Sequence, residues 1–212
     1  MKAILNRKHR ALSGVLVTII IMVASIVLAS GVVLYGTTLF QGGAQQESIS
    51  VSGIKMWVHG TDSEGLAWGA FAVRNTGDKV LSVDRIAVRG TDIPFAQWYP
   101  DTDVTSDMIQ QPMNFTGWSG VGGLLENDGA AVATCGGTVM ALVLQSGVGA
   151  LGHFCADAAG GPIGLDPGQA AIIYFRLNNG TVGSVDGGAQ TSVSVFAGKT
   201  GAPQSIAIGS KI

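Results

Sequence analysis

The feature that most constrains this chain is an uninterrupted apolar stretch near its N-terminus, residues 12–40. It holds 29 residues without a charged side chain. A helix of this length spans about 44 Å. It is longer than one crossing requires, because a helix of about 20 residues already spans the apolar core of a bilayer. A helix that is apolar on all sides must be buried in lipid or in other protein. We therefore expect this stretch to form a helix that crosses a membrane or packs inside an assembly.

A short basic segment precedes the apolar stretch. It contains no acidic residue, and its basic residues are Lys2, Arg7, Lys8 and Arg10. Positive side chains beside a membrane helix favour the cytoplasmic side. The remainder of the chain is then expected to face outward.

Three interpretations of this N-terminal region remain open. In the first, it is a secretory signal peptide with an apolar region from Val15 to Leu28, although such regions usually have only about 7–15 residues. In the second, it is a plain single-span anchor. In the third, it is a helix that packs against other helices, because its small side chains let helix backbones approach closely. These small residues are Gly14, Ala24, Ser25, Ala29, Ser30, Gly31 and Gly36.

The sequence Arg10-Ala11-Leu12-Ser13, followed by a long apolar helix, resembles the class III signal peptide of archaeal type IV pilins and archaellins. In that family a prepilin peptidase removes a short basic leader immediately before the helix. The resemblance implies a processing site at Arg10, Ala11 and Leu12, with a cleaved leader over residues 1–11 and a mature chain that starts at Leu12. Bacterial type IV pilins usually carry Glu as the fifth mature residue, and the Leu16 found here favours the archaeal branch.

The same resemblance implies a function. The chain would be a structural subunit of an extracellular filament, inserted in the cytoplasmic membrane before assembly. Its partners would be copies of itself, the prepilin peptidase, a membrane assembly platform and an ATPase. Archaellins are usually cut after Gly, so Ala11 favours an adhesion pilus over a rotating archaellum. An alternative of another class is a membrane-anchored extracellular binding module. No motif indicates an enzyme, and no cofactor is expected.

Residues 47–212 are expected to form one outer domain. Glycine contributes 32 of the 212 residues and only 12% are charged, which is typical of a β-rich extracellular domain. Removing the leader leaves 8 basic and 14 acidic residues, a net charge near −6, and this excludes an electrostatic nucleic-acid interface. The predicted fold is α+β: a hydrophobic helix over residues 12–46, then an antiparallel β-sandwich.

Short apolar segments between turn residues predict the strands of this sandwich. A change of alternation at Gly53 predicts a β-bulge in the first strand. The turn residues Asn75-Thr76-Gly77-Asp78 predict a β-hairpin between the second and third strands. The expected strands are Ser48–His59, Leu66–Arg74, Lys79–Arg89, Ile93–Tyr99, Ala130–Thr134, Thr138–Leu144, Ala170–Leu177, Thr191–Ala197 and Gln204–Ile208.

Two cysteines, Cys135 and Cys155, flank a glycine-rich segment. In an oxidising, outward-facing domain we expect them to pair, which would contribute about 3 kcal/mol by constraining the unfolded chain. The alternative is two buried free thiols. The spacing of cysteine and histidine does not match a zinc site, so no metal is expected.

Three further groups of residues are candidate surface sites. Asn114 and Asn179 each begin an N-glycosylation sequon, and the alternative for Asn179 is a residue that serves only in a hairpin turn. Asp101, Asp103 and Asp107 lack the glycine and glutamate of an EF-hand loop, so a solvated turn is favoured over a calcium site. The four tryptophans are expected to be core or edge aromatics, with a sugar-binding face as the alternative.

Overall fold

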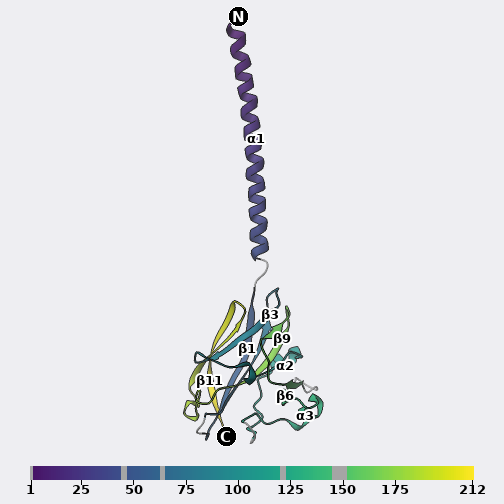
Figure 1. The fold of residues 1–212 in the computed structure, drawn as a ribbon, viewed down its shortest axis with the longest axis vertical. Coiled ribbons are helices and arrows are strands. Elements are labelled where there is room, and N and C mark those ends of the chain that lie inside the picture. The colour runs from purple at the N-terminus through teal and green to yellow at the C-terminus, as the bar shows by residue number, and fades with distance from the viewer. Residues whose placement is uncertain (1, 44–46, 63–64, 120–122, 145–151) are drawn as a thin grey trace. The chain divides into compact units, whose positions relative to one another are not determined.

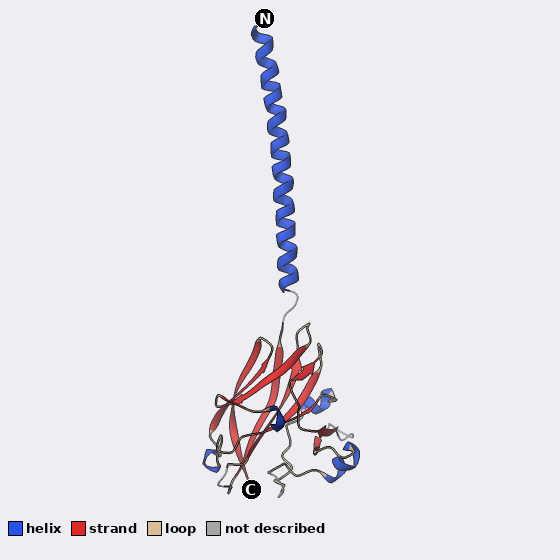
Figure 2. Ribbon diagram, viewed as in Figure 1, coloured by secondary structure: helices blue, strands red, loops and turns tan. Residues whose placement is uncertain are grey.

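The structure is a computed structural model that describes residues 2–43, 47–62, 65–119, 123–144 and 152–212. The chain divides into two compact units, Met1–Gln45 and Gln46–Ile212. The first unit is helical and the second is built mainly from strands (Figures 1 and 2). A long apolar helix followed by a β-rich unit confirms the expected α+β class.

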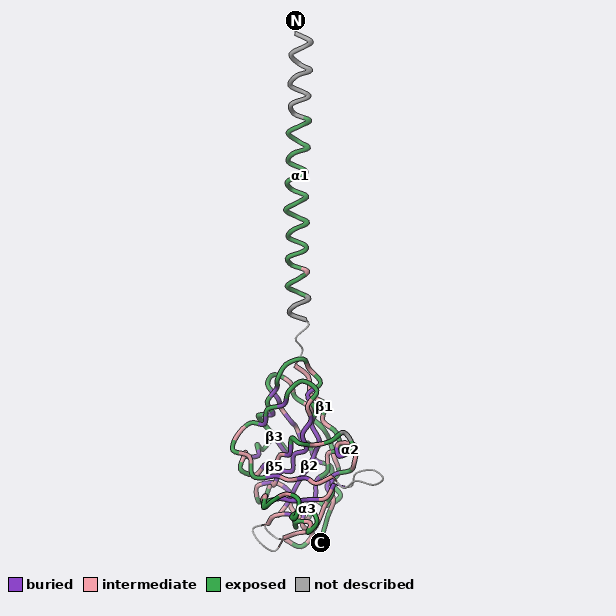
Figure 3. Tube along the Cα trace, turned by 90° about the vertical axis from the view of Figure 1, so that its right-hand side faces the viewer, coloured by how far each residue is buried: buried purple, intermediate pink, exposed green. Residues whose placement is uncertain are grey.

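Helix α1 runs from Lys2 to Gly43, so it contains the expected helix and also extends over the basic segment before it. Its central part, Gly14–Leu39, has 26 residues with a mean hydropathy of 2.7. None of this part is buried within its own chain (Figure 3). The helix is therefore long and apolar enough to cross a membrane. Ala44, Gln45 and Gln46, where the expected helix ends, lie outside the described residues.

The outer unit is organised around a curled nine-stranded sheet with the order β4-β3-β10-β11-β1-β2-β9-β5, in which β8 pairs with β3. A separate two-stranded sheet joins β6 and β7. The strands of the large sheet are β1 Ile49–His59, β2 Ala67–Asn75, β3 Leu81–Val88, β4 Thr91–Asp92, β5 Trp98–Asp101, β8 Ile163–Leu165, β9 Ala170–Arg176, β10 Gln190–Ala197 and β11 Thr200–Lys211. The remaining elements are β6 Met140–Leu144, β7 Gly152–Ala156, α2 Ser106–Gln110, α3 Gly129–Cys135 and the 3₁₀ turns η1 Phe95–Gln97 and η2 Ser184–Asp186.

Strand β1 contains the predicted bulge. Its register with β2 shifts between Ser52 and Lys55, and Gly53 has a φ of 65°, which favours glycine. The sheet is nevertheless mixed rather than wholly antiparallel, because β1 and the last residues of β11 run parallel, from Met56↔Ile208 onward. The expectation of a purely antiparallel sandwich was wrong in this respect.

The predicted hairpin between the second and third strands was also wrong. Strand β2 pairs with β1 and β9, whereas β3 pairs with β10, β4 and β8. The turn after β2 is an arch that carries the chain to another part of the sheet. Asn75, fully buried, holds this arch: its Nδ2 donates to the carbonyls of Lys79 (2.6 Å) and Leu165 (3.0 Å), and its Oδ1 accepts from the Gly77 amide.

The predicted strand Ala130–Thr134 is instead part of helix α3. Asp128 caps the N-terminus, with its Oδ1 accepting from the Ala130 amide at 2.9 Å, and Gly136 ends the helix in the left-handed conformation at φ 64°. The predicted strand Ile93–Tyr99 is only partly correct, because a 3₁₀ turn occupies its middle and β5 begins at Trp98. In both cases local capping and turn geometry override a short apolar pattern.

Two hydrophobic cores lie on opposite faces of the β2–β9 part of the sheet. The first lies inside the curl and includes Phe71 and Ile173 from this part together with Val83 and Val195 from β3 and β10. The second lies on the other face, where Met140, Leu142 and Phe154 of the small sheet cover Trp68 and Tyr174. The unit therefore has a third layer that the predicted two-layer sandwich lacked.

Gly69 of β2 is expected to tolerate no larger residue. A Cβ there would lie 2.3 Å from the ring of Phe175, its neighbour on β9, and that ring is fully buried and cannot move aside. We expect Gly69→Ala to lower the free energy of unfolding by about 1–3 kcal/mol through overpacking. Gly164→Ala in β8, where a Cβ would meet open space, is the matched control and should change it by less than about 0.5 kcal/mol. Urea denaturation measures both, and equal stability of the two variants would contradict the close approach.

Candidate functional site

The apolar helix is the strongest candidate for function because its apolar side chains are exposed, and its serine and threonine hydroxyls are satisfied within the helix. Each serine and threonine between Gly14 and Leu39 donates its hydroxyl to the carbonyl three residues earlier, at 2.8–2.9 Å. These residues are Thr18, Ser25, Ser30, Thr37 and Thr38. Hydroxyls bonded in this way add little cost to burial in lipid or in a dry helix interface. The helix surface therefore suits either environment along this length.

The small residues of α1 leave room for a neighbouring backbone. A Cβ at Gly14, Gly31 or Gly36 would meet no atom within 4 Å. No contact among the described residues accounts for glycine at these positions, and each glycine costs about 1 kcal/mol relative to alanine in a helix interior. Close approach by another helix does account for them.

The residues of the predicted processing site lie within the span of α1, but their side chains are outside the described part of the structure. Cleavage between Ala11 and Leu12 therefore stays a prediction. A more general interpretation of this region is supported. An exposed apolar helix near the N-terminus indicates a membrane-anchored or exported protein.

The cysteines form the expected disulfide, Cys135–Cys155, which joins α3 to β7. Asp101 supports the same region from β5. Its side chain is 7% exposed, its Oδ2 accepts from the Cys155 amide at 2.9 Å, and its Oδ1 accepts from the Asp103 amide at 2.9 Å. Burial raises the pKa of the Asp101 carboxyl, and the two amide hydrogen bonds oppose that rise. Asp101 is thus a structural link and not a solvated turn residue.

The other two aspartates of the acidic group do not join Asp101 at a common site. Asp103 and Asp107 are exposed. Within the described ranges, no group of three or more His, Cys, Asp or Glu side chains is placed to hold a metal ion. The calcium alternative has no geometric support in this part of the chain.

The sequon at Asn114 is held against the core. The Asn114 amide donates to the hydroxyl of Tyr174 at 3.1 Å, and that hydroxyl donates to the Asn114 carbonyl at 2.9 Å. Its exposed side chain donates from Nδ2 to the Val143 carbonyl at 3.3 Å. The Thr116 hydroxyl is buried, with no hydrogen-bond partner among the described residues. Modification of Asn114 stays a prediction.

The sequon at Asn179 lies in an exposed turn after β9. The Thr181 amide donates to the Asn178 carbonyl at 3.1 Å, and Gly180 has a φ of 81°. Asn179 is thus a turn residue, but the expected hairpin was wrong, because β9 pairs with β2 and β5 whereas the next strand, β10, pairs with β3 and β11. That role does not exclude glycosylation, which stays a prediction here too.

Three of the four tryptophans are core residues, as expected: Trp57, Trp68 and Trp98 are at most 6% exposed. Trp118 is half-buried, and its ring lies 5.1 Å from that of His59 and 5.0 Å from that of Phe115. Its indole nitrogen donates to the Lys211 carbonyl at 3.3 Å. These contacts are typical of an edge aromatic that closes the end of the sheet.

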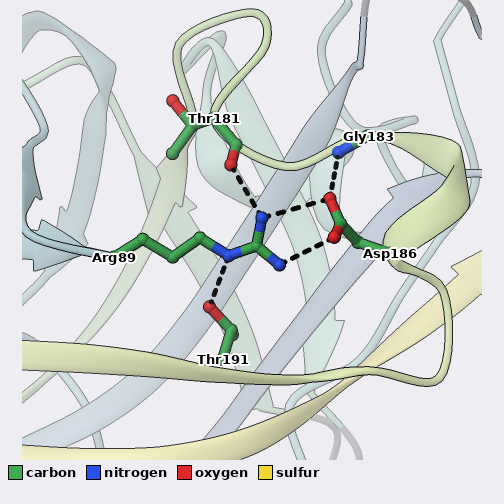
Figure 4. Close-up of polar contacts among 5 residues, drawn as sticks. All are labelled: Arg89, Thr181, Gly183, Asp186 and Thr191. Atoms are coloured by element: carbon green, nitrogen blue, oxygen red, sulfur yellow. Dashed lines mark hydrogen bonds and ion pairs between the residues drawn. The ribbon is translucent and has the colours of Figure 1, made fainter.

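An ion-pair clamp around Arg89 was not anticipated from the sequence. Arg89 and Gly90 form the two-residue turn between β3 and β4, and Arg89 has a φ of 53°, a conformation unusual for a residue with a side chain. Its guanidinium donates to both carboxylate oxygens of Asp186, at 2.8 and 3.2 Å (Figure 4). It also donates to the Thr181 carbonyl and the Thr191 hydroxyl, each at 3.3 Å. The clamp links the turn between β3 and β4 to η2 and β10.

The clamp predicts a pH dependence of stability. Hydrogen bonds from Arg89 lower the pKa of Asp186 below its usual value near 3.8, so its contribution is complete above that value and is lost as the pH falls through the folded-state pKa. Because the pair is partly exposed, we expect Asp186→Asn to cost at most about 1 kcal/mol at pH 7. The difference from the wild type should be smaller at pH 3, because the contribution is progressively lost as the pH falls from 3.8 through the lowered folded-state pKa. Denaturation midpoints at both pH values check this, and a difference that persists undiminished at pH 3 would contradict it.

The arrangement of the chain is thus an exposed apolar helix whose serine and threonine hydroxyls are satisfied within the helix, followed by a disulfide-linked β unit. This architecture is compatible with that of pilin-like filament subunits. A comparison of the chain with protein-family models found no match, and a comparison with curated proteins found no similar protein.

Proposed function

We propose that this protein is the structural subunit of an extracellular filament of the archaeal type IV pilus kind, used for surface attachment. In this proposal a prepilin peptidase removes residues 1–11, and the helix that begins at Leu12 leaves the membrane to pack against helices of other copies. A membrane assembly platform and an ATPase drive that transfer. The outer unit coats the filament.

One observation carries the proposal: the 26 residues Gly14–Leu39 expose apolar side chains on all sides, and none of them is buried by the described residues. Lipid can cover such a helix in the monomer, and neighbouring helices can cover it in a polymer. The open glycine positions favour the second partner, because a lone lipid-facing anchor gains nothing from them.

The charge of the mature chain fits this role. Cleavage at Leu12 would remove 4 of the 12 basic residues and leave a net charge near −6. Cleavage leaves the α-amino group of Leu12 as the one charge at that end of the helix, and the loss of four basic side chains lowers the electrostatic cost of leaving the membrane, since basic residues hold a helix terminus on the cytoplasmic side.

The proposal is tested on material sheared from the cell surface. In cells that carry the prepilin peptidase and the assembly machinery, we expect filaments that an antibody to residues 46–212 labels along their whole length in electron micrographs. Protein found only in the membrane fraction and monomeric in mild detergent would contradict the filament. That result would favour the membrane-anchored binding module.

A further inference from the structure

Two hollows lie on either side of the short helix α2, on the outer face of the sheet. One, of about 250 Å³, is lined by residues that include Arg74 and Gln169. The other, of about 610 Å³, is lined by residues that include Lys55 and Pro112. Both hollows share Ile109 of α2 in their walls. Together they form one surface, which we name the α2 surface.

The α2 surface carries positive charge that is not neutralised. Lys55 and Arg74 are exposed, and neither has a carboxylate partner in the portion of the chain that the structure describes. Among the described residues, the Arg74 guanidinium donates one hydrogen bond, from Nε to the Gly168 carbonyl at 3.2 Å. No acidic residue lines either hollow, and Asp107 of the same helix lies outside both linings. The surface is thus suited to an acidic partner with some apolar area.

The disulfide lobe of the same unit carries a surface with acidic and apolar side chains and no basic ones. The disulfide lobe, residues 124–144 and 152–157, contains α3, β6 and β7 and has no Lys or Arg. Val132 and Val139 are 43% and 47% exposed on it. Asp128 and Asp157 flank these valines, and each uses one carboxylate oxygen to accept from a nearby amide, that of Ala130 or of Val139. The second oxygen of each carboxylate accepts no hydrogen bond from the described residues and is open to an outside donor.

The α2 surface and the disulfide lobe are neighbours on the outer face of the sheet, because Met108 of α2 packs in the same core as Met140 and Phe154 of the lobe. In both views α3 lies nearer than α2 to the end at which the chain finishes (Figures 1 and 3). Within the described residues of one copy, neither Lys55 nor Arg74 forms an ion pair with Asp128 or Asp157. A contact between two different surfaces of one protein is heterologous, and its repetition builds an open polymer when the rotation between copies does not close a ring.

We propose that the disulfide lobe of one copy docks on the α2 surface of the next copy along the filament. The carboxylates of Asp128 and Asp157 face Lys55 and Arg74, and the exposed valines cover the apolar wall at Ile109. This proposal rests on the proposed function, since it requires a polymer in which outer units repeat along the axis. It assigns to the disulfide the role of holding α3 and β7 in the shape that docks.

A zero-length carbodiimide cross-linker tests this contact in intact filaments, because it joins a lysine amine only to a carboxylate that touches it. We expect a ladder of cross-linked subunits on a denaturing gel. Mass spectrometry should identify peptides that join Lys55 to Asp128 or Asp157. The ladder should be lost in Lys55→Arg, which keeps the charge but removes the amine, and retained in the matched control Lys79→Arg.

The failures of the two proposals are distinguishable. Filaments that form normally but give no peptide joining Lys55 to the lobe, or a ladder that Lys55→Arg leaves unchanged, would overturn the docking and leave the filament in place. The same cross-link in monomers dispersed in detergent would also overturn it, because it would then arise within one chain. A complete lack of filaments would overturn the proposed function, and the docking with it.

Discussion

Replacing Gly31 by leucine is expected to abolish filament assembly while the protein remains inserted in the membrane. A Cβ at this position meets no other atom within 4 Å among the described residues, and leucine is both more apolar than glycine and a better helix former. The isolated helix should therefore be undamaged. Between two closely packed helices, the added side chain costs about 1–3 kcal/mol at each contact, and the contact repeats in every subunit.

The yield of sheared filaments, relative to total membrane-inserted protein, measures this effect. We expect a loss of at least about tenfold, which corresponds to about 1.4 kcal/mol. Val33→Leu is the matched control, since Val33 is already large and 62% exposed in the isolated helix, and it should assemble normally. Normal assembly of the Gly31→Leu variant would show that this side of the helix does not pack against another helix.

Replacing Trp68 by alanine is expected to cause the largest loss of stability of any single substitution considered for the outer unit. Trp68 is fully buried between the sheet and the disulfide lobe, and its indole nitrogen donates to the Gly123 carbonyl at 2.9 Å. Its ring lies 5.3 Å from that of Tyr99. Removing a buried tryptophan costs about 3–5 kcal/mol through lost contacts and the cavity left behind.

Chemical denaturation of the full chain in detergent, followed by the fluorescence of the remaining tryptophans, measures this loss. Trp68→Phe is the control, because it keeps an aromatic ring in the layer and removes chiefly the hydrogen bond, at about 1–3 kcal/mol. An alanine variant within about 1 kcal/mol of the wild type would contradict the packed third layer.

The N-terminal helix and most strands could be predicted because their signals are local. A continuous apolar run near the N-terminus predicts a helix whatever surrounds it, and the slip of alternation at Gly53 located the bulge. The turn after Asn75 had the residues of a hairpin, but which strands pair depends on contacts far along the chain. Here the buried amide of Asn75 bonds to Leu165, ninety residues away, and no local pattern shows this.

The sequence of two central strands also indicates the third layer. Strand β2 reads Ala67-Trp68-Gly69-Ala70-Phe71 without alternation, and β9 is apolar for six residues from Ala170 to Phe175. A continuous apolar strand is typical of one buried on both faces, whereas a two-layer sandwich predicts alternation. By contrast, the clamp at Arg89 depends on a left-handed backbone at a non-glycine residue, which composition does not reveal. The α2 surface combines residues from distant segments and required the fold.

The N-terminus and intact mass of the protein sheared from the cell surface test the central claim most directly. The account predicts a chain that begins at Leu12, with the apolar helix retained and the leader of residues 1–11 removed. Added mass on that chain would also report glycans at Asn114 or Asn179. A chain that begins at Met1 would indicate an uncleaved anchor, and one that begins near Val32 would indicate ordinary secretion with loss of the helix. Either result would contradict a filament built on α1.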